Sequence, residues 1–576
     1  MSTGTTFAAA GAAPAASSAR AIRPRLSRDD VTLRLLVLAI VVALVVFVVL
    51  PLSALLGKAL EDHDGAFVGL ANFAAYFGDP ALAGNLFNSL WISALSTVIC
   101  VTLAFVFAYG LTRTCMPGRG VFKAVAQIPI LAPSLLPAIS LVYLFGNQGL
   151  LKGWLMGASI YGPIGIVIGE VFWTFPHALI ILTTALAISD ARLYEAAEAL
   201  RASQRRIFFT VTLPGARYGL ISAIFVVFTL VITDFGVPKV IGGQFDVLAT
   251  DIYKQVVGQQ NFQMGAVVGV VLLLPAVLAF VGDRIVQRRQ AALLSARAVP
   301  LIPKPNRAVD LTFFAICSVI ALAVLVILAV AVFASLATFW PYNLTPSLKN
   351  YDFDNMDGGG WASYGNSLTL AALTAVFGAA IIFTGAYAIE KTPRFGAGRA
   401  VGQLLALLPL AVPGLVLGLG YIFFFNDPAN PLGFLYGGMA ILVICTISHF
   451  YSVAHLTATT ALKQIDPEFE TVSASLKVPV WRTFAVVTVP VCLPAILDIA
   501  IYLFVNAMTT VSALVFLYSP DTTLAAIAVL NMDDAGDIAP AAAMATMILL
   551  TSAAVRIAYT VLTRGLLGRA QAWRRR

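Results

Sequence analysis

Residues 190–214 read Asp190-Ala-Arg-Leu-Tyr-Glu195-Ala196-Ala197-Glu-Ala-Leu-Arg201-Ala-Ser-Gln-Arg-Arg-Ile-Phe208-Phe-Thr-Val-Thr-Leu213-Pro214. The same framework returns at residues 466–490 as Asp466-Pro-Glu-Phe-Glu470-Thr471-Val-Ser473-Ala-Ser-Leu-Lys477-Val-Pro-Val-Trp-Arg-Thr-Phe484-Ala-Val-Val-Thr-Val-Pro490. An Asp, a Phe and a Pro keep their places in both copies, 276 residues apart. This repetition predicts two homologous halves fused head to tail.

The repeat extends upstream of this stretch with almost the same displacement. Three short matches lie 278 residues apart: Asn88-Ser89-Leu90 with Asn366-Ser367-Leu368, Ala108-Tyr109 with Ala386-Tyr387, and Gly118-x-Gly120 with Gly396-x-Gly398. In a hydrophobic chain, two repeated halves favour a pathway built between them, as in many transporters.

The composition is that of an integral membrane protein, since 60% of the 576 residues are hydrophobic and only 11% are charged. A helix needs about 20 apolar residues to cross the hydrocarbon core. Apolar runs of that order predict an all-α polytopic membrane protein with about 12 transmembrane helices in two tandem sets of six. They lie near 32–55, 87–112, 124–146, 163–188, 217–235 and 263–283, and near 310–336, 366–389, 400–425, 434–458, 493–517 and 540–563.

Lysine and arginine gather in alternate connections, which predicts the orientation because cytoplasmic loops retain positive charge. The basic segments are 20–28, 113–123, 192–217, 284–307, 391–399, 463–482 and 564–576. The other connections contain only Lys58, Lys152, Lys239, Lys254 and Lys349. Both termini are therefore expected in the cytoplasm. The net charge of +8 is attributed to topology and lipid headgroups, and no nucleic-acid partner is expected.

The repeat also predicts the domain organisation. Residues 1–31 form a disordered cytoplasmic tail, 32–290 the first half, 291–307 a cytoplasmic linker and 308–576 the second half. The five cysteines have no paired spacing, so neither a disulfide framework nor a metal site is expected. No pair of residues is spaced as a catalytic nucleophile and base, so no catalytic residue is assigned.

The loop at 190–214 resembles the EAA loop of bacterial ABC importer permeases, in which a Glu-Ala-Ala triplet begins a short helix and a Leu-Pro pair closes the segment. The resemblance implies that the loop sits in a cleft of a separate ATPase subunit. It assigns this coupling role to Glu195, Ala196, Ala197 and Arg201, and to Glu470, Thr471, Ser473 and Lys477 in the second copy. The alternative reading is a solvated interfacial helix that joins two spans.

In the family, a glycine follows four residues after the second alanine of the triplet. The two copies have Arg201 and Lys477 at this position instead. A turn with positive φ would be strained by either residue, so the helix break is expected to fall elsewhere. The second copy also lacks a literal Glu-Ala-Ala.

The chain has no Gly-x-x-x-x-Gly-Lys-Ser/Thr phosphate loop, so ATP and Mg are expected on a partner subunit and the chain itself is not expected to be an enzyme. The resemblance implies two copies of an ABC ATPase subunit below the chain and a periplasmic substrate-binding protein above it. It also implies import across a bacterial inner membrane, with no cofactor bound by this chain.

Two further stretches of sequence narrow the choice of substrate. Residues 233–253, and residues 506–518 together with 531–540, are similar to the fused permeases of iron(III) importers, and more similar to those assigned to 2-aminoethylphosphonate uptake. This resemblance implies 2-aminoethylphosphonate as the substrate, with iron(III) as the second candidate.

The substrate-pathway candidates are ionisable and polar residues in or near the spans, where burial of a charge costs about 2.5–3.5 kcal/mol. They are Asp234, Asn506, Thr509, Thr510 and Glu170. Asp234 would meet the ammonium group of a zwitterion, and the amide and hydroxyl groups of the second half would meet its phosphonate. Alternatively, Asp234 caps a broken helix and Glu170 holds helices together.

Two other classes of protein remain open at this stage. An ion-coupled secondary transporter of the twelve-helix kind also has repeated halves and both termini inside. It would contain proton or sodium sites at mid-membrane and would need no ATPase. A membrane enzyme would use Glu170 or a histidine in an intramembrane pocket. Co-purification of an ATPase separates the importer from both.

Overall fold

The structure is a computed structural model that describes residues 27–293, 299, 301–393, 395–466 and 468–570, without the side chains of residues 288–293 and 564–570. Most of the predicted tail at 1–31 lies outside the described residues, as does part of the predicted linker at 291–307. In the described part of the linker, Val299 accepts a backbone hydrogen bond from Ala191 at 2.9 Å.

The named elements of the first half are all helices, joined by turns and loops. Its elements are α1 (Arg28–Leu44), η1 (Val45–Val49), α2 (Leu50–Ala59), α3 (Ala71–Gly78), α4 (Pro80–Arg113), α5 (Arg119–Gln127), η2 (Ile128–Leu131), α6 (Leu135–Phe145), η3 (Lys152–Leu155), α7 (Pro163–Ala187), α8 (Ala191–Ala199), α9 (Gln204–Ile207), η4 (Phe208–Thr212), α10 (Leu213–Thr233), α11 (Gly236–Ile241), α12 (Leu248–Tyr253), η5 (Lys254–Gly258) and α13 (Phe262–Leu293).

The second half adds one short antiparallel hairpin to a similar series of helices. Its elements are α14 (Arg307–Leu336), β1 (Ala337–Phe339), β2 (Asn343–Pro346), η6 (Lys349–Tyr351), η7 (Phe353–Asn355), α15 (Gly360–Lys391), α16 (Gly396–Leu407), η8 (Leu408–Ala411), α17 (Gly414–Phe425), η9 (Gly433–Leu435), α18 (Met439–Lys463), α19 (Glu468–Ser475), α20 (Val480–Thr483), η10 (Phe484–Thr488), α21 (Val489–Thr509), η11 (Pro520–Thr522), α22 (Ala525–Ala535) and α23 (Ile538–Ala570).

Ten helices in the described residues are long and apolar enough to cross a membrane, and up to 12 spans result if two bent helix pairs are counted. This confirms the predicted all-α polytopic membrane fold. The bent pairs are Arg119–Leu131 with Leu135–Phe145, at 102°, and Gly396–Ala411 with Gly414–Phe425, at 111°. The predicted span at 493–517 also ends earlier, since α21 stops at Thr509.

The two bends have the same cause in both halves. Ala132 and Val412 each precede a proline and adopt extended backbone, with ψ of 145° and 116°. The proline ring clashes with a helical conformation of the residue before it, so the helix breaks there. Apolar periodicity alone predicted a straight span at 124–146 and at 400–425, and the structure bends both.

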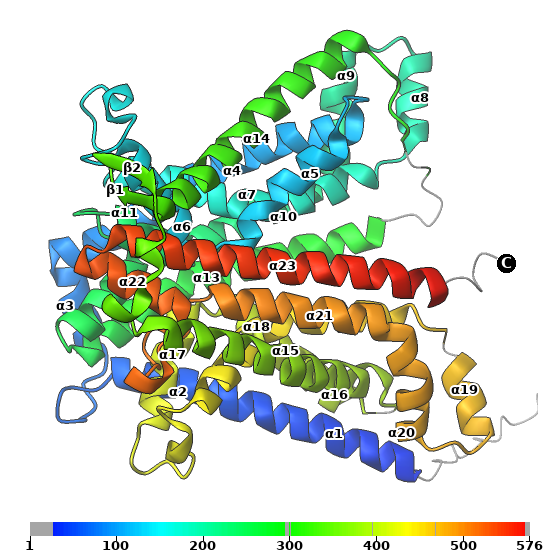
Figure 1. The fold of residues 1–576 in the computed structure, drawn as a ribbon. Coiled ribbons are helices and arrows are strands. Elements are labelled where there is room, and N and C mark those ends of the chain that lie inside the picture. The colour runs from blue at the N-terminus through cyan, green and yellow to red at the C-terminus, as the bar shows by residue number, and fades with distance from the viewer. Residues whose placement is uncertain (1–26, 294–298, 300, 394, 467, 571–576) are drawn as a thin grey trace, which may run out of the picture.

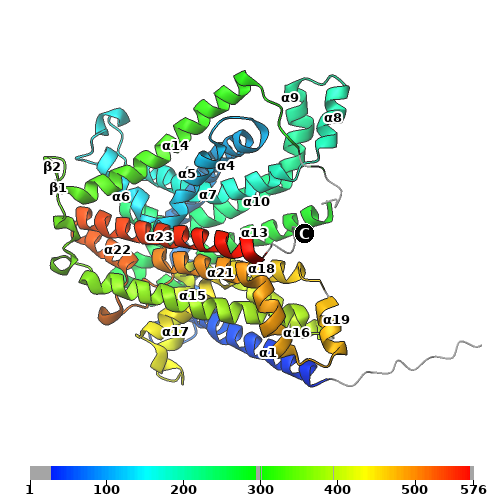
Figure 2. The same cartoon turned by 45° about the vertical axis from the view of Figure 1, so that its right-hand side comes forward.

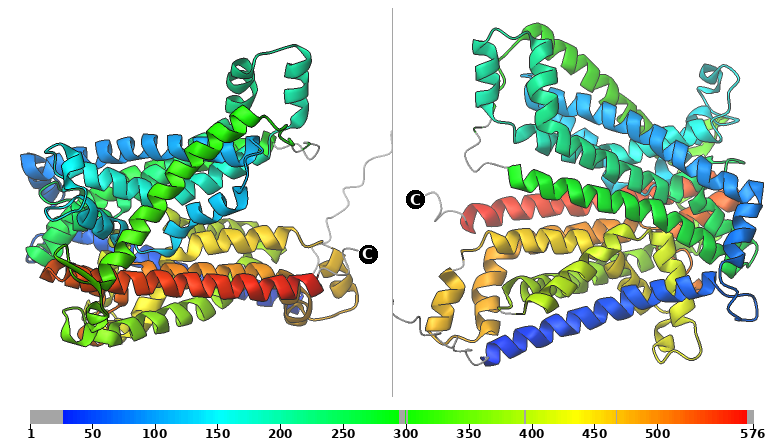
Figure 3. Two further views of the ribbon diagram at one scale, coloured as in Figure 1. Left: turned by 45° about the horizontal axis from the view of Figure 1, so that its top comes forward. Right: turned by 180° about the vertical axis from the view of Figure 1, so that it is seen from behind.

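The first helix of each half packs on the opposite half. Helix α1 contacts α15 and α16, and α14 contacts α4, α5 and α6 (Figures 1 and 3). The two halves of the sequence are therefore interlocked, because the first long helix of each half packs against the outside of the other half.

The molecule has two distinct ends (Figure 1). Helices α8, α9, α19 and α20 project at one, which we call the loop end. The β1–β2 hairpin, α3, α11 and α22 lie at the opposite one, which we call the far end. The long helices connect the two, so a movement at the loop end has a continuous helical route to the far end.

Candidate functional site

The two repeated loops form matching pairs of short helices at the loop end (Figures 1 and 2). Each begins at an aspartate that caps the helix N-terminus. The Asp190 Oδ1 accepts the Arg192 N–H at 3.1 Å, and the Asp466 Oδ1 accepts the Glu468 N–H at 2.9 Å. These bonds satisfy backbone donors that a helix start leaves open.

Each short helix ends at the residue that replaces the family glycine. Arg201 has a φ of 54° and Lys477 a φ of 55°, both in the left-handed region. The N–H of the following residue reaches back five residues, from Ala202 to the Ala197 carbonyl at 3.0 Å and from Val478 to the Ser473 carbonyl at 2.9 Å. This is a Schellman ending. The expectation that the helix break falls elsewhere was therefore wrong.

We predict that Arg201→Gly stabilises the end of α8. The left-handed conformation costs a residue with a Cβ about 1–2 kcal/mol, and glycine lacks that cost. Hydrogen exchange of the Ala202 amide, which makes the closing bond, should slow severalfold in the variant. Arg201→Val should speed the same exchange, because a β-branched residue tolerates this backbone least. Equal exchange in the two variants would contradict the assignment.

The predicted coupling residues present a partly exposed face at the loop end. Glu195, Ala196, Arg201, Thr471 and Lys477 are exposed, and Ala197 and Ser473 are half-buried. Large apolar side chains lie exposed beside them: Leu193, Leu200, Phe469, Val472 and Leu476. Leu200 and Leu476 hold the same repeat position and are 83% and 70% exposed. Large apolar side chains are thus exposed at equivalent places in the two copies, as is common at interaction sites.

Glu470 differs from the other coupling candidates because it faces the bundle. Its Oε1 lies 2.7 Å from the Lys391 Nζ at the end of α15. Its counterpart in the first half is Tyr194, one residue before Glu195, and the Arg113 guanidinium at the end of α4 lies 5.1 Å from that ring. In both halves a basic residue thus holds the loop helix onto its own bundle.

A second contact of each loop uses aromatic residues from the repeat. The ring of Phe208 lies 6.0 Å from that of Tyr109, and the ring of Phe484 lies 4.7 Å from that of Tyr387. Both phenylalanines begin a π-helical turn that leads into the next long helix. Each loop is therefore fixed to α4 or α15 and continuous with α10 or α21.

These continuous helices form two rods, which we define as Gln204–Thr233 and Val480–Thr509. Each contains 30 residues, or roughly 45 Å at the usual helical rise. They end at Asp234 and Thr510, which occupy equivalent positions with nearly identical backbone angles, φ −71° and ψ 137° against φ −74° and ψ 134°. The rods connect the loop end to two matching helix breaks.

The structure brings Asp234 and Glu170 together. Asp234 is 9% exposed, and its Oδ2 accepts the Val237 N–H at 2.8 Å, which caps the start of α11. Glu170 on α7 is fully buried near Asp234, and neither of its carboxyl oxygens has a hydrogen-bond partner among the described residues. The capping role of Asp234 agrees with this geometry, whereas Glu170 makes no hydrogen bond that would join helices among the described residues.

The substrate-pathway candidates of the second half make hydrogen bonds within their own helix, α21. The Asn506 Nδ2 donates to the Tyr502 carbonyl at 2.7 Å, and the Thr509 Oγ1 donates to the Val505 carbonyl at 3.0 Å. Thr510 is 8% exposed at the end of α21. In this conformation Asn506 and Thr509 therefore make their hydrogen bonds within α21, next to the helix break.

Both halves of the chain match one protein family, described as "Binding-protein-dependent transport system inner membrane component", over residues 106–292 and 380–568. This chain belongs to that family. It is a two-repeat permease subunit of an ABC importer, a multi-pass protein of the inner membrane.

Two relatives align with most of the permease, and a third aligns with less than half of it. It is 27% identical over 541 residues to the ferric transport system permease protein FbpB of Actinobacillus pleuropneumoniae, covering 90% of this chain and 76% of the relative. It is 27% identical over 503 residues to the putative ferric transport system permease protein FbpB 1 of Haemophilus influenzae, covering 84% and 78%. The spermidine/putrescine transport system permease protein PotB of Haemophilus influenzae is 27% identical over 253 residues, covering 41% of this chain and 88% of the relative.

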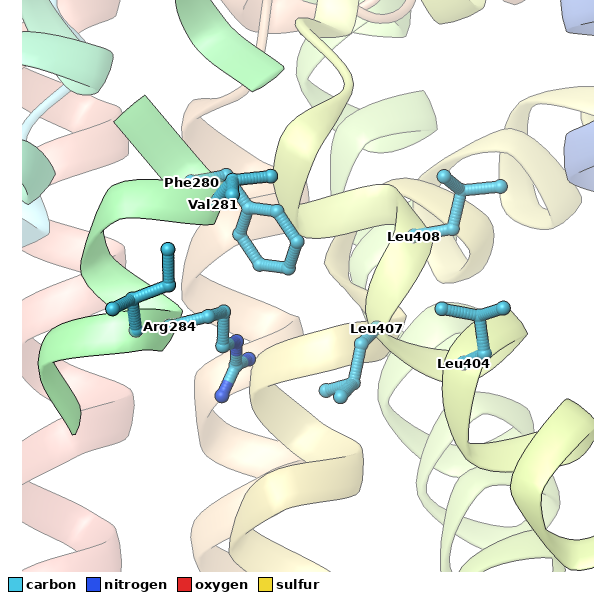
Figure 4. Close-up of a pocket in the computed structure, with 7 residues that line it drawn as sticks. Phe280, Val281, Arg284, Leu404, Leu407 and Leu408 are labelled. Carbon is cyan, nitrogen blue, oxygen red and sulfur yellow. The ribbon is translucent and has the colours of Figure 1, made fainter. Parts of the chain in front are cut away.

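A cavity of about 280 Å³ lies between α13 and the α16–η8 segment of the permease (Figure 4). It is lined by Phe280, Val281, Arg284, Ile285, Leu404, Leu407 and Leu408. Arg284 is the single charged residue in this lining, and no carboxylate or hydroxyl group accompanies it. The cavity therefore lacks the paired charges that a zwitterion requires.

Sequence reasoning missed a charged cluster at the far end of the permease. Lys239 on α11 and Asp534 on α22 form an ion pair of 2.8 Å between the two halves, beside Asp533. All three lie inside the stretches that resemble the phosphonate permeases, but no role was assigned to them. A signal was available, because Lys239 is one of only five lysines and arginines in the predicted outer connections.

We predict a pH dependence from Asp533, which lies outside the membrane-spanning helices. Burial, and then the neighbouring carboxylate of Asp534, raise the pKa of Asp533 to about 7, against an opposing effect of Lys239. Tyr143 and Tyr161 lie near enough to Asp533 to interact with it electrostatically. Because an acid with a raised pKa favours the folded arrangement while protonated, its contribution is complete below the ordinary aspartate pKa and is lost as the pH rises through about 7.

The measurement is the thermal unfolding midpoint of the permease and of its Asp533→Asn variant between about pH 5 and pH 8. The wild-type midpoint should fall relative to that of the variant as the pH rises, because asparagine cannot ionise. A difference that stays constant over this range would contradict the assignment.

Proposed function

We propose that the permease imports 2-aminoethylphosphonate, driven by two copies of a separate ABC ATPase subunit and supplied by a periplasmic binding protein. The ATPase subunits bind at the loop end, which faces the cytoplasm together with both termini. The binding protein delivers the solute at the far end. ATP and Mg belong to the partner subunits in this proposal, and the permease supplies the path.

The observation that carries the ATP-driven mechanism is the pair of loop helices. Two copies of one helical motif project at the same end, each with an exposed apolar tip and each leading directly into a rod. A helix that lays an apolar face in a partner's groove is a common recognition mode. Movement of the loop passes along the chain into the rod, and the Phe208–Tyr109 or Phe484–Tyr387 contact passes it to α4 or α15.

The substrate proposal rests on the similarity of residues 233–253, 506–518 and 531–540 to permeases assigned to 2-aminoethylphosphonate. The chemistry of the far end supports a zwitterion, because carboxylates and an ammonium group lie together there in Lys239, Asp533 and Asp534. Asp234 and Glu170 add two carboxyl groups at the first helix break. These acids suit the substrate's ammonium group, and Lys239 suits its phosphonate.

Iron(III) is the second candidate substrate, favoured by the relatives. The two relatives that cover most of this chain are named ferric transport permeases. Carboxylate oxygens also suit a hard cation. In the described residues no group of three or more His, Cys, Asp or Glu side chains is arranged to hold a metal ion, so iron would pass through without a built site.

The test is ATP hydrolysis by the complete complex of permease, ATPase and binding protein in proteoliposomes. 2-Aminoethylphosphonate, iron(III) and a polyamine are compared at equal saturation of the binding protein. We expect stimulation by the phosphonate alone. Stimulation by iron(III) alone would assign the permease to the second candidate, and stimulation by none would contradict both substrates.

A further inference from the structure

One ion pair connects the two halves at the far end. The Lys239 Nζ on α11 lies 2.8 Å from the Asp534 Oδ1 on α22, with side chains that are 22% and 43% exposed. The remaining ion pairs of the described far end, Lys58–Glu61 and Lys254–Asp246, lie within the first half. A bond that crosses from one half to the other has to break if the halves separate there.

Aromatic residues support this contact. The Lys239 Nζ lies 5.0 Å from the centroid of the Tyr253 ring, in reach of a cation–π interaction. Tyr253 also stacks on Phe516 of the second half, with ring centroids 6.3 Å apart and planes 26° apart. The ion pair is thus part of a small interface between the halves, formed by Lys239, Tyr253, Phe516 and Asp534.

Lys239 and Phe516 lie a few residues beyond the ends of the two rods. Helix α11 begins at Gly236, two residues after the first rod ends at Asp234. Phe516 lies six residues beyond Thr510, where the second rod ends, and α22 follows. A displacement of either rod therefore moves one side of the interface relative to the other.

The repeat does not duplicate this ion pair. The positions equivalent to Lys239 and Asp534 are Val515 and Gly258, which carry no charge. The ion pair is therefore a single feature that joins the two halves and is not part of the repeated framework.

We propose that the Lys239–Asp534 ion pair is a latch that holds the far ends of the two halves together in the resting permease and breaks when that end opens to receive solute. This rests on the ATP-driven import proposed above. The latch keeps the outer passage shut until the loaded binding protein and the ATPase movement supply the energy to separate the halves.

The test is the ATPase activity of the complex without binding protein, measured for Lys239→Met. This variant removes the positive charge that pairs with Asp534 and also interacts with Asp533. A partly exposed ion pair is worth up to about 1 kcal/mol, so its loss should raise this basal activity up to about fivefold. The charge exchange Lys239→Asp with Asp534→Lys should return the activity toward the wild-type value.

Lys254→Met is the matched control, because Lys254 pairs with Asp246 at 2.6 Å at the same end but within one half. Its basal activity should stay at the wild-type level. An unchanged activity in Lys239→Met, a charge exchange that fails to restore it in a complex that still assembles, or an equal rise in the control would each overturn the latch.

A second measurement tests the separation of the two positions directly. Lys239→Cys with Asp534→Cys, bridged by a reducible bifunctional thiol reagent about as long as the replaced side chains, should stop the remaining uptake and recover it on reduction, whereas each single cysteine should not respond. Full uptake by the cross-linked permease would overturn the latch. Stimulation of the wild-type complex by loaded binding protein tests the proposed function separately, because the latch concerns the activity without it.

Discussion

Replacing Leu200 and Leu476 together by Asp is expected to abolish ATP-driven uptake by the reconstituted importer. The two side chains are 83% and 70% exposed at equivalent tips of α8 and α19. Burying a leucine in a partner's groove contributes about 1.5–3 kcal/mol, so the two sites together account for at least about a hundredfold in affinity for the ATPase subunits. An aspartate at each tip also adds a desolvation cost.

The measurement is the affinity of the purified permease for its ATPase subunit, followed by uptake. Trp154→Asp is the control, because Trp154 is 75% exposed in η3, on the α6–α7 connection that contacts the hairpin at the far end. It should leave the affinity unchanged. Full ATPase binding by the double variant would contradict docking at these tips.

Ile224→Pro in the first rod is expected to uncouple ATP hydrolysis from transport. Proline removes a helical hydrogen bond and clashes with the preceding turn, at a cost of about 3 kcal/mol or more in a helix interior, which kinks the rod. Ile224 is 40% exposed in the middle of α10, so the change interrupts the rod without opening a buried core. Uptake should fall about a hundredfold, while ATPase subunits still bind and hydrolyse ATP.

The control for this prediction comes from the second half. The second rod contains Pro494 inside α21, and the equivalent position in the first rod is Tyr218. Tyr218→Pro should therefore be tolerated with most of the uptake retained. If Ile224→Pro transports as well as Tyr218→Pro does, the rod is not the route by which movement reaches the far end.

The repeat and the apolar periodicity predicted most of the architecture, because membrane spans and duplicated loops leave direct signals in one sequence. The bends at Ala132 and Val412 were harder to predict from the sequence. Each of these residues has extended backbone before a proline, but both lie inside continuous apolar runs. The backbone of Arg201 and Lys477 was predicted wrongly. Propensity disfavours a left-handed conformation there, but the Schellman hydrogen bonds at both sites maintain it.

The candidate site was predictable where it depends on local sequence. The exposed faces of α8 and α19 follow from the loop pattern, whereas the inward position of Glu470 depends on Lys391, which lies 79 residues earlier on another helix. Contacts between the halves left no local signal. Lys239 and Asp534 are separated by almost 300 residues, and only the packing of α11 near α22 brings them together.

The most direct test of the account is uptake of labelled 2-aminoethylphosphonate into proteoliposomes that contain the permease, its ATPase subunit and its binding protein. We predict accumulation that requires all three proteins and ATP on the loop-end side, and that persists when proton and sodium gradients are collapsed. Accumulation by the permease alone, driven by an ion gradient without ATP, would contradict the account and identify a secondary transporter.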